Sequence, residues 1–231
     1  MDLFLTALSG IAWTIVYIEA IRLGFKQKTY AIPIAALGLN IAWEWTYAVQ
    51  GFATDPQLQS WVNLIWALAD VVILITFFRY GRRELPGFVS RPLFIVWGAA
   101  IIVTSFVIQW LFIAEFGVAD QKAPTYSAFL QNLLMSGLFI AMFVARRGPR
   151  GQSLLIAVAK WVGTLAPTIL LGFLADSLFV IVVGLLCGVF DLAYIALLLW
   201  ARRNPERFSV DSEYPTASGE PVTSTGRRDR T

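Results

Sequence analysis

The sequence has 231 residues, of which 58% are hydrophobic, its mean hydropathy is +0.67 and its formal net charge is +3. Soluble globular domains average about 45 to 50% apolar residues, so this composition predicts an all-α polytopic membrane protein. The sequence contains no histidine and one cysteine, Cys187, which excludes haem sites, most catalytic zinc sites, Ser-His and Cys-His nucleophiles and an internal disulfide.

Seven apolar stretches follow one another, each near or above the length of about 20 residues that crosses a bilayer. They are residues 3–23, 30–50, 61–78, 92–112, 125–145, 153–173 and 177–200. Lys and Arg gather in the loops after the first, third and fifth stretches, whereas the other three loops contain only Lys122. The positive-inside rule therefore predicts an amino terminus outside the membrane and a carboxyl terminus in the cytoplasm. Because topology explains the basic residues, we expect no nucleic-acid partner.

Two parts of the chain differ in composition. Residues 1–201 are expected to form one seven-helix transmembrane domain. Residues 202–231 are rich in Ser, Pro, Glu, Arg and Thr, which predicts a disordered cytoplasmic tail. The connections between the stretches are short, so an active site must lie inside the helix bundle.

Carboxyl groups lie at membrane depth in three of the stretches: Glu44, Asp70 and Asp191. A central Asp costs about 2.5 to 3.5 kcal/mol on an insertion scale, so such residues usually face the protein interior and mark a functional site. Asn132 lies at a depth comparable to that of Glu44. Helical spacing places other polar and aromatic residues on the same faces as the acids: Asn40 and Tyr47 with Glu44, Trp66 with Asp70, and Tyr194 with Asp191.

Glu44 has no basic residue at its own level, whereas Asp191 lies at roughly the depth of Lys160. A buried Lys160–Asp191 pair that fixes helix packing is therefore an open alternative to a catalytic Asp191. Desolvation and a second carboxyl group nearby disfavour a charged Glu44, so we expect a neutral acid that can donate its proton.

A pocket in the outer half of the bundle would suit such an acid. With Trp43, Trp45, Tyr47 and Trp66 nearby, it would let Glu44 protonate an alkene or epoxide while the ring faces stabilise the carbocation and exclude water. Asn40 could orient the acid, and either Asp191 or Asp70 could accept the final proton. This chemistry is a protonation-initiated terpene cyclisation of a lipophilic substrate that partitions into the bilayer.

Two short runs carry a family resemblance. Residues 40–47 (Asn-Ile-Ala-Trp-Glu-Trp-Thr-Tyr) and 190–194 (Phe-Asp-Leu-Ala-Tyr) resemble the integral-membrane terpene cyclases of meroterpenoid and indole-terpenoid biosynthesis, which are known from fungi and have bacterial relatives. The resemblance implies a metal-independent enzyme without a cofactor, whose second-helix glutamate and last-helix aspartate are the acids needed for cyclisation. These roles fall on Glu44 and Asp191.

The same resemblance implies the substrate, a farnesyl or geranylgeranyl chain attached to an aromatic or alkaloid head group. Supporting roles are then expected for Asp70, Asn40 and Asn132, and substrate contact or cation stabilisation for Trp43, Tyr47, Trp66 and Tyr194. The Ala- and Arg-rich composition and the short loops are typical of a bacterial plasma-membrane protein.

Other classes remain as alternatives. Asp70 and Asp191 are each followed by an apolar run and an arginine pair, which suggests a small transporter of two three-helix repeats about a linking helix, with midplane carboxyls that bind substrate or protons. A lipid-binding scaffold without turnover is also compatible with the composition. A retinal protein is disfavoured because its last helix would need a lysine, which residues 177–200 lack.

Overall fold

The computed structural model describes residues 1–208, and over this range the chain is entirely helical. Seven long helices form the bundle. They are α1 (Asp2–Gln27), α2 (Ile34–Thr54), α3 (Leu58–Tyr80), α4 (Arg91–Phe116), α5 (Lys122–Ala145), α6 (Leu154–Pro167) and α7 (Leu178–Arg203). Three short helical turns complete the described chain: η1 (Gly81–Glu84), η2 (Thr168–Leu174) and η3 (Pro205–Arg207).

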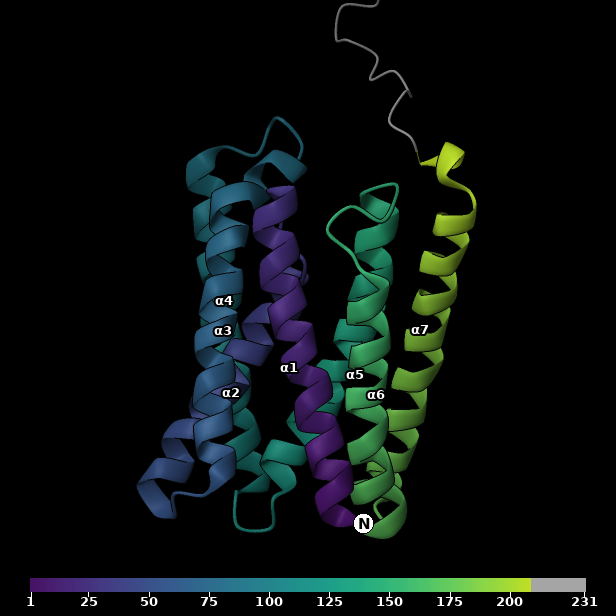
Figure 1. Cartoon of the computed structure of the whole chain (residues 1–231). Helices are drawn as coiled ribbons and strands as arrows, with labels where there is room; N and C mark the ends of the chain where they lie inside the picture. Colours follow the sequence, from purple (N-terminus) through teal and green to yellow (C-terminus); the bar gives the residue numbers. More distant parts are fainter. Residues whose placement is uncertain (209–231) are drawn as a thin grey trace, which may run out of the picture.

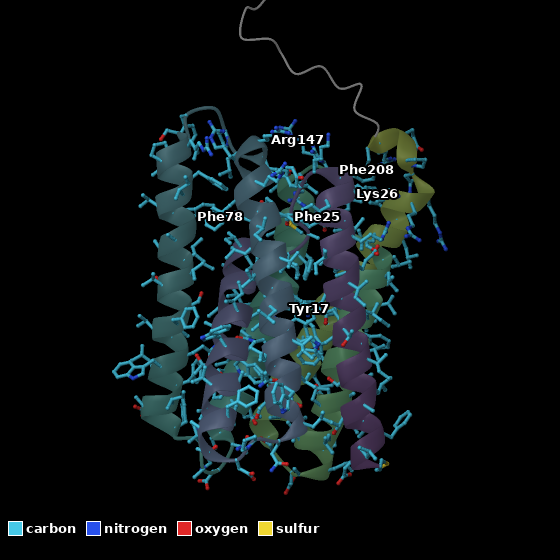
Figure 2. All side chains as sticks on the ribbon, turned by 60° about the vertical axis from the view of Figure 1, so that its left-hand side comes forward. Tyr17, Phe25, Lys26, Phe78, Arg147 and Phe208 are labelled. Carbon is cyan, nitrogen blue, oxygen red and sulfur yellow. The ribbon has the colours of Figure 1, made fainter. Side chains whose placement is uncertain are left out.

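The long helices run roughly side by side (Figure 1). The amino terminus lies at the bottom of this view, and α7 ends at the top beside the loops that follow α1, α3 and α5. These are the basic loops, and Lys26 and Arg147 lie at this same end (Figure 2). The arrangement gathers the positive charge at one end of the bundle. That this end faces the cytoplasm stays a prediction.

Six of the helical segments are long and apolar enough to cross a membrane, and α2 is not among them. The second predicted stretch is thus a helix of 21 residues, but a less apolar one than the other six. Its place in the bundle gives the reason: α2 packs against α3, α4 and α5, and most of its first 15 residues are buried. A helix sheltered by its neighbours can carry polar side chains that a lipid-facing helix cannot.

Large apolar side chains cover the outside of the other helices. Ile18, Ile65, Val103 and Val189 are all more than 60% exposed on α1, α3, α4 and α7. An exposed apolar surface that extends over several helices is typical of a protein surrounded by lipid. The structure therefore agrees with an integral membrane protein.

Local sequence signals explain several helix boundaries. Ser90 and Ser153 cap α4 and α6, each accepting a hydrogen bond from a backbone N–H of the first turn. Pro167 has no backbone N–H, and α6 widens beyond it into the π-helical turn η2. Gly38 lets α2 and α4 approach closely, because a Cβ at this position would lie 2.8 Å from Ser105 Oγ.

A polar clamp holds the basic end of the bundle together. Arg146, at the end of α5, forms a buried ion pair with Glu84 of η1, with 2.9 Å between Nε and Oε2. Its guanidinium also lies 4.3 Å from the centre of the Tyr30 ring and donates to the Tyr30 carbonyl at 2.9 Å. Burial raises the pKa of the Tyr30 phenol. The clamp joins the connections that follow α1, α3 and α5.

The helical chain continues past residue 201, since α7 ends at Arg203 and η3 follows it. The remaining part of the predicted tail, residues 209–231, lies outside the described residues.

Candidate active site

Glu44 of α2 and Asp70 of α3 lie together inside the bundle. Their exposed fractions are 4% and 0%, and the two carboxyl groups are close enough to interact electrostatically. Within residues 1–208 neither of them forms a salt bridge. Two carboxylates buried in this way would repel each other and lose their hydration, so the arrangement favours a shared proton over two charges.

Asn40 lies at the centre of the cluster. Its Nδ2 donates to Asp70 Oδ2 at 2.8 Å and, in a short hydrogen bond, to the hydroxyl of Tyr17 on α1. The Tyr17 hydroxyl also interacts with the carboxyl groups of both Glu44 and Asp70. Tyr17 lies about half-way along the bundle (Figure 2). Three helices thus contribute to one buried polar cluster, which we call the acid cluster: Tyr17, Asn40, Glu44 and Asp70.

Two glutamines extend the acid cluster towards α4 and α5. Gln131 Nε2 donates to Asn40 Oδ1 at 3.4 Å, and Gln109 Nε2 donates to Gln131 Oε1 at 3.1 Å. Both glutamines are buried, with exposed fractions of 7% and 1%. Gln109 lies one turn beyond Ser105, the residue that contacts Gly38, so the close approach of α2 and α4 helps to place it.

Aromatic rings flank the acid cluster. The indole of Trp66 stacks on the Tyr17 ring with 5.7 Å between ring centres. Trp43 and Tyr47, on the same helix as Glu44, pack together with ring centres 5.0 Å apart, and Trp43 Nε1 donates to the Pro124 carbonyl at 3.0 Å. These rings are fixed by contacts to neighbouring helices rather than free at the membrane surface.

Asp191 belongs to a second cluster, between α5, α6 and α7. Lys160 Nζ lies 2.8 and 3.0 Å from the two Asp191 oxygens and donates to Ser136 Oγ at 2.7 Å. All three side chains are buried. The ion pair considered from the sequence is therefore present, and we call this group the ion-pair cluster: Ser136, Lys160 and Asp191.

The remaining predicted residues lie near the ion-pair cluster. Asn132 is one turn before Ser136 on α5, and its buried Oδ1 has no hydrogen-bond partner. Tyr194 stacks on Phe139 with ring centres 5.3 Å apart, in the apolar core. The predicted site residues thus form two groups, with Asn40, Asp70, Trp43, Tyr47 and Trp66 around Glu44, and Asn132 and Tyr194 around Asp191.

One open surface groove lies away from Glu44. It has a volume of about 500 Å³, lies between α5 and α7, and is lined by apolar residues that include Leu133, Gly137 and Leu186. None of the residues around Glu44 lines this groove, so the expected pocket beside Glu44 stays a prediction.

Three members of these networks were missed by the sequence reasoning: Tyr17, Gln109 and Gln131. The sequence reasoning selected Asn132 by its depth and did not select its neighbour Gln131. Depth does not show which side of a helix a residue faces, and adjacent residues point about 100° apart. A search for every amide and phenol in the apolar stretches would have found all three. It would not have shown which of them face Asn40.

Comparison with known families gives the biochemical class. Residues 1–204 match the family model of Pyr4-like transmembrane terpene cyclases. The chain belongs to this family. The match confirms the resemblance seen in the two short runs, and it favours an enzyme over the transporter and the scaffold.

Several fungal relatives of this Pyr4-family chain are terpene cyclases. The terpene cyclase macJ of Penicillium terrestre is 34% identical over 70% of this chain and 62% of its own length. The terpene cyclase pyr4 of Aspergillus fumigatus is 25% identical over 86% of each chain. The Pyr4-family terpene cyclase mfmH of Annulohypoxylon moriforme is 27% identical over 68% of this chain and 64% of its own length.

The chain spans less than two thirds of mfmH and macJ. Because these relatives are fungal, the comparisons give no support to the expected bacterial source. No solved structure matches the chain.

Proposed function

We propose that this membrane protein cyclises a prenyl chain by protonating it, with Glu44 as the acid. The observation that carries the proposal is the acid cluster itself, in which Glu44 and Asp70 are buried together and pair with no cation of residues 1–208. Such a pair holds a proton in a site shielded from water, which is the requirement for an acid that must protonate an alkene or epoxide. The first step uses only this side-chain proton.

The surrounding rings support the steps that follow. Protonation of an alkene leaves a carbocation, and the faces of Trp and Tyr rings attract positive charge. Trp66 stacked on Tyr17, and Trp43 packed on Tyr47, provide such faces next to the acid cluster. Aromatic side chains that are held in place also exclude water, which would otherwise quench the cation before the product has cyclised.

Asp191 is proposed as the second residue that the reaction needs. Lys160 contacts both of its oxygens, which stabilises the charged carboxylate. A carboxylate at this position would stabilise positive charge that has moved along the chain and would accept the last proton, forming the final double bond. The acid and the base would then serve different parts of an extended substrate.

We propose as substrate a farnesyl or geranylgeranyl chain attached to an aromatic or alkaloid head group. The family and the names of its members support a terpene substrate. A substrate of this kind partitions into lipid, which explains why the acid is inside a helix bundle.

Isotope incorporation tests the proposal. The purified protein is given a panel of farnesylated and geranylgeranylated aromatic compounds, each as the terminal alkene and as the terminal epoxide, in deuterated water. We expect a cyclised product, and we expect one non-exchangeable deuterium in each product formed from an alkene. A product formed from an alkene without deuterium would show that its cyclisation does not begin by protonation.

A further inference from the structure

Three amides from three helices form a chain that ends at the acid cluster. Gln109 donates to Gln131, and Gln131 donates to Asn40. An amide oxygen can only accept and an amide nitrogen can only donate, so each link sets the orientation of the next. With its oxygen facing Gln131, Asn40 must direct its nitrogen towards Tyr17 and Asp70.

This orientation distinguishes the two carboxyl groups. Asn40 gives one hydrogen to Asp70 Oδ2 and the other to the Tyr17 oxygen. A donated hydrogen bond favours the charged form of a carboxyl group, so Asp70 is the member of the pair that is stabilised as a carboxylate. Glu44 faces the Asn63 amide, whose nitrogen lies 3.3 Å from Oε2 in the orientation that satisfies both atoms of the amide, a longer contact than the one from Asn40 to Asp70.

No nearby cation changes this assignment within the described chain. Lys160, the buried lysine, is held by Asp191 and Ser136. Arg22 pairs with Glu19, and Arg146 pairs with Glu84. The hydrogen bond that Asp70 accepts from Asn40 is shorter than the contact between Asn63 and Glu44, and this difference distinguishes the two acids.

Starting from the proposed function, we propose that Glu44 and Asp70 share one proton and that Gln109, Gln131 and Asn40 are positioning residues that keep this proton on Glu44. In the resting protein Glu44 is then neutral and Asp70 is charged. Glu44 is ready to protonate the substrate, and the negative charge of Asp70 adds to the attraction of the site for a carbocation.

Infrared spectroscopy of the resting full-length protein tests where the proton lies. A protonated carboxylic acid has a carbonyl band separate from that of a carboxylate, and a heavy carbon isotope in the carboxyl group shifts it. We expect one such band at neutral pH that shifts when the glutamates are labelled and not when the aspartates are labelled. A band that follows the aspartates, or no band, would overturn the proposal.

Gln131→Leu tests the amide chain without changing either carboxyl group. We expect part of the band to follow labelled aspartate, because Asn40 is then free to turn. We also expect kcat for cyclisation to fall about tenfold with KM unchanged, since the acid holds its proton for a smaller part of the time. The matched control is Gln152→Leu, at a glutamine that is as buried as Gln131 but lies in the loop after α5.

If Gln131→Leu retains the band and kcat of the Gln152→Leu control, the amide chain does not position the proton. If Gln131→Leu does not fold, Gln109→Leu, one link further from Asn40, gives the same comparison. The infrared result needs no substrate. It can therefore fail while Glu44 still proves to be the acid, and it can hold if the substrate class proposed above is wrong.

Discussion

The acid cluster and the ion-pair cluster differ in one respect that decides what their carboxyl groups can do. Asp191 faces Lys160, and both partners are almost completely buried. Glu44 faces Asp70, another acid, and amides and a phenol complete its surroundings. A lysine beside a carboxyl group stabilises its charge, whereas a second acid favours a retained proton. Two buried carboxyl groups of one bundle are thus suited to opposite tasks, proton donation and charge stabilisation.

Removing the proton from the acid cluster gives the largest expected effect. Glu44→Gln keeps the size and hydrogen-bonding ability of the side chain but has no proton to donate. We expect a loss of at least about 100-fold in cyclised product, the usual scale for a general acid. The matched control is Glu19→Gln, at a glutamate held by Arg22 near the end of α1. If both variants cyclise the substrate equally well, Glu44 is not the acid.

Breaking the ion-pair cluster separates stability from activity. Lys160→Met leaves a buried carboxylate without a partner, which costs about 3 to 5 kcal/mol in soluble proteins. We expect a large drop in thermal stability in detergent, and recovery in the double variant Lys160→Met with Asp191→Leu. We also expect this double variant to fold but form no cyclised product. A stable and fully active double variant would show that the ion pair serves helix packing and is not needed for cyclisation.

The aromatic rings are expected to have a smaller effect. Trp66→Leu removes the ring that stacks on Tyr17, and cation–π contacts contribute about 0.5 to 2 kcal/mol. We expect about a fivefold fall in turnover and a larger share of partly cyclised products in the product mixture. Trp45→Leu is the control, because Trp45 is 43% exposed on the same helix as Glu44. Identical product mixtures from the two variants would show that Trp66 does not contact the cation.

The partly exposed Arg22–Glu19 ion pair gives the smallest expected effect and serves as a reference for the buried Lys160–Asp191 pair. Arg22 approaches Glu19 at 2.6 Å, but its side chain is half exposed. Arg22→Gln should therefore lower the thermal stability much less than Lys160→Met and leave product formation unchanged. Thermal denaturation in detergent, run beside Lys160→Met, measures the difference. Equal losses from the two variants would mean that burial does not strengthen the Lys160–Asp191 pair.

The sequence predicts most of the fold because membrane crossing imposes a simple rule. Runs of about 20 apolar residues and a basic bias in alternate loops located all seven long helices. The helix boundaries differ from the predicted ones where local chemistry outweighs hydropathy. After Pro167, for example, the chain continues as the π-helical turn η2. Residues 30–50 were read as another membrane span, but burial among neighbouring helices, not apolar composition, accounts for the place of α2.

The candidate site was less predictable because it depends on which helices are neighbours. Depth along each helix correctly placed Glu44 and Asp70 in the interior, and the shared level of Lys160 and Asp191 indicated their pair. Depth does not show which side of a helix a residue faces. The depth argument therefore named Asn132 and did not name Gln131, the neighbour that faces Asn40. Tyr17 was missed because the first stretch has no deep carboxyl group to draw attention to it.

The modest hydropathy of α2 has a consequence for biogenesis. A segment of modest hydropathy that also carries a carboxyl group near its middle is a poor substrate for insertion by the translocon, because a central acidic residue costs about 2.5 to 3.5 kcal/mol and few apolar residues offset it. Helix α3, which follows after a connection of only a few residues and is strongly apolar, can draw α2 into the bilayer as the other arm of a hairpin. During synthesis Glu44 would then enter the membrane only after α3 has emerged from the ribosome.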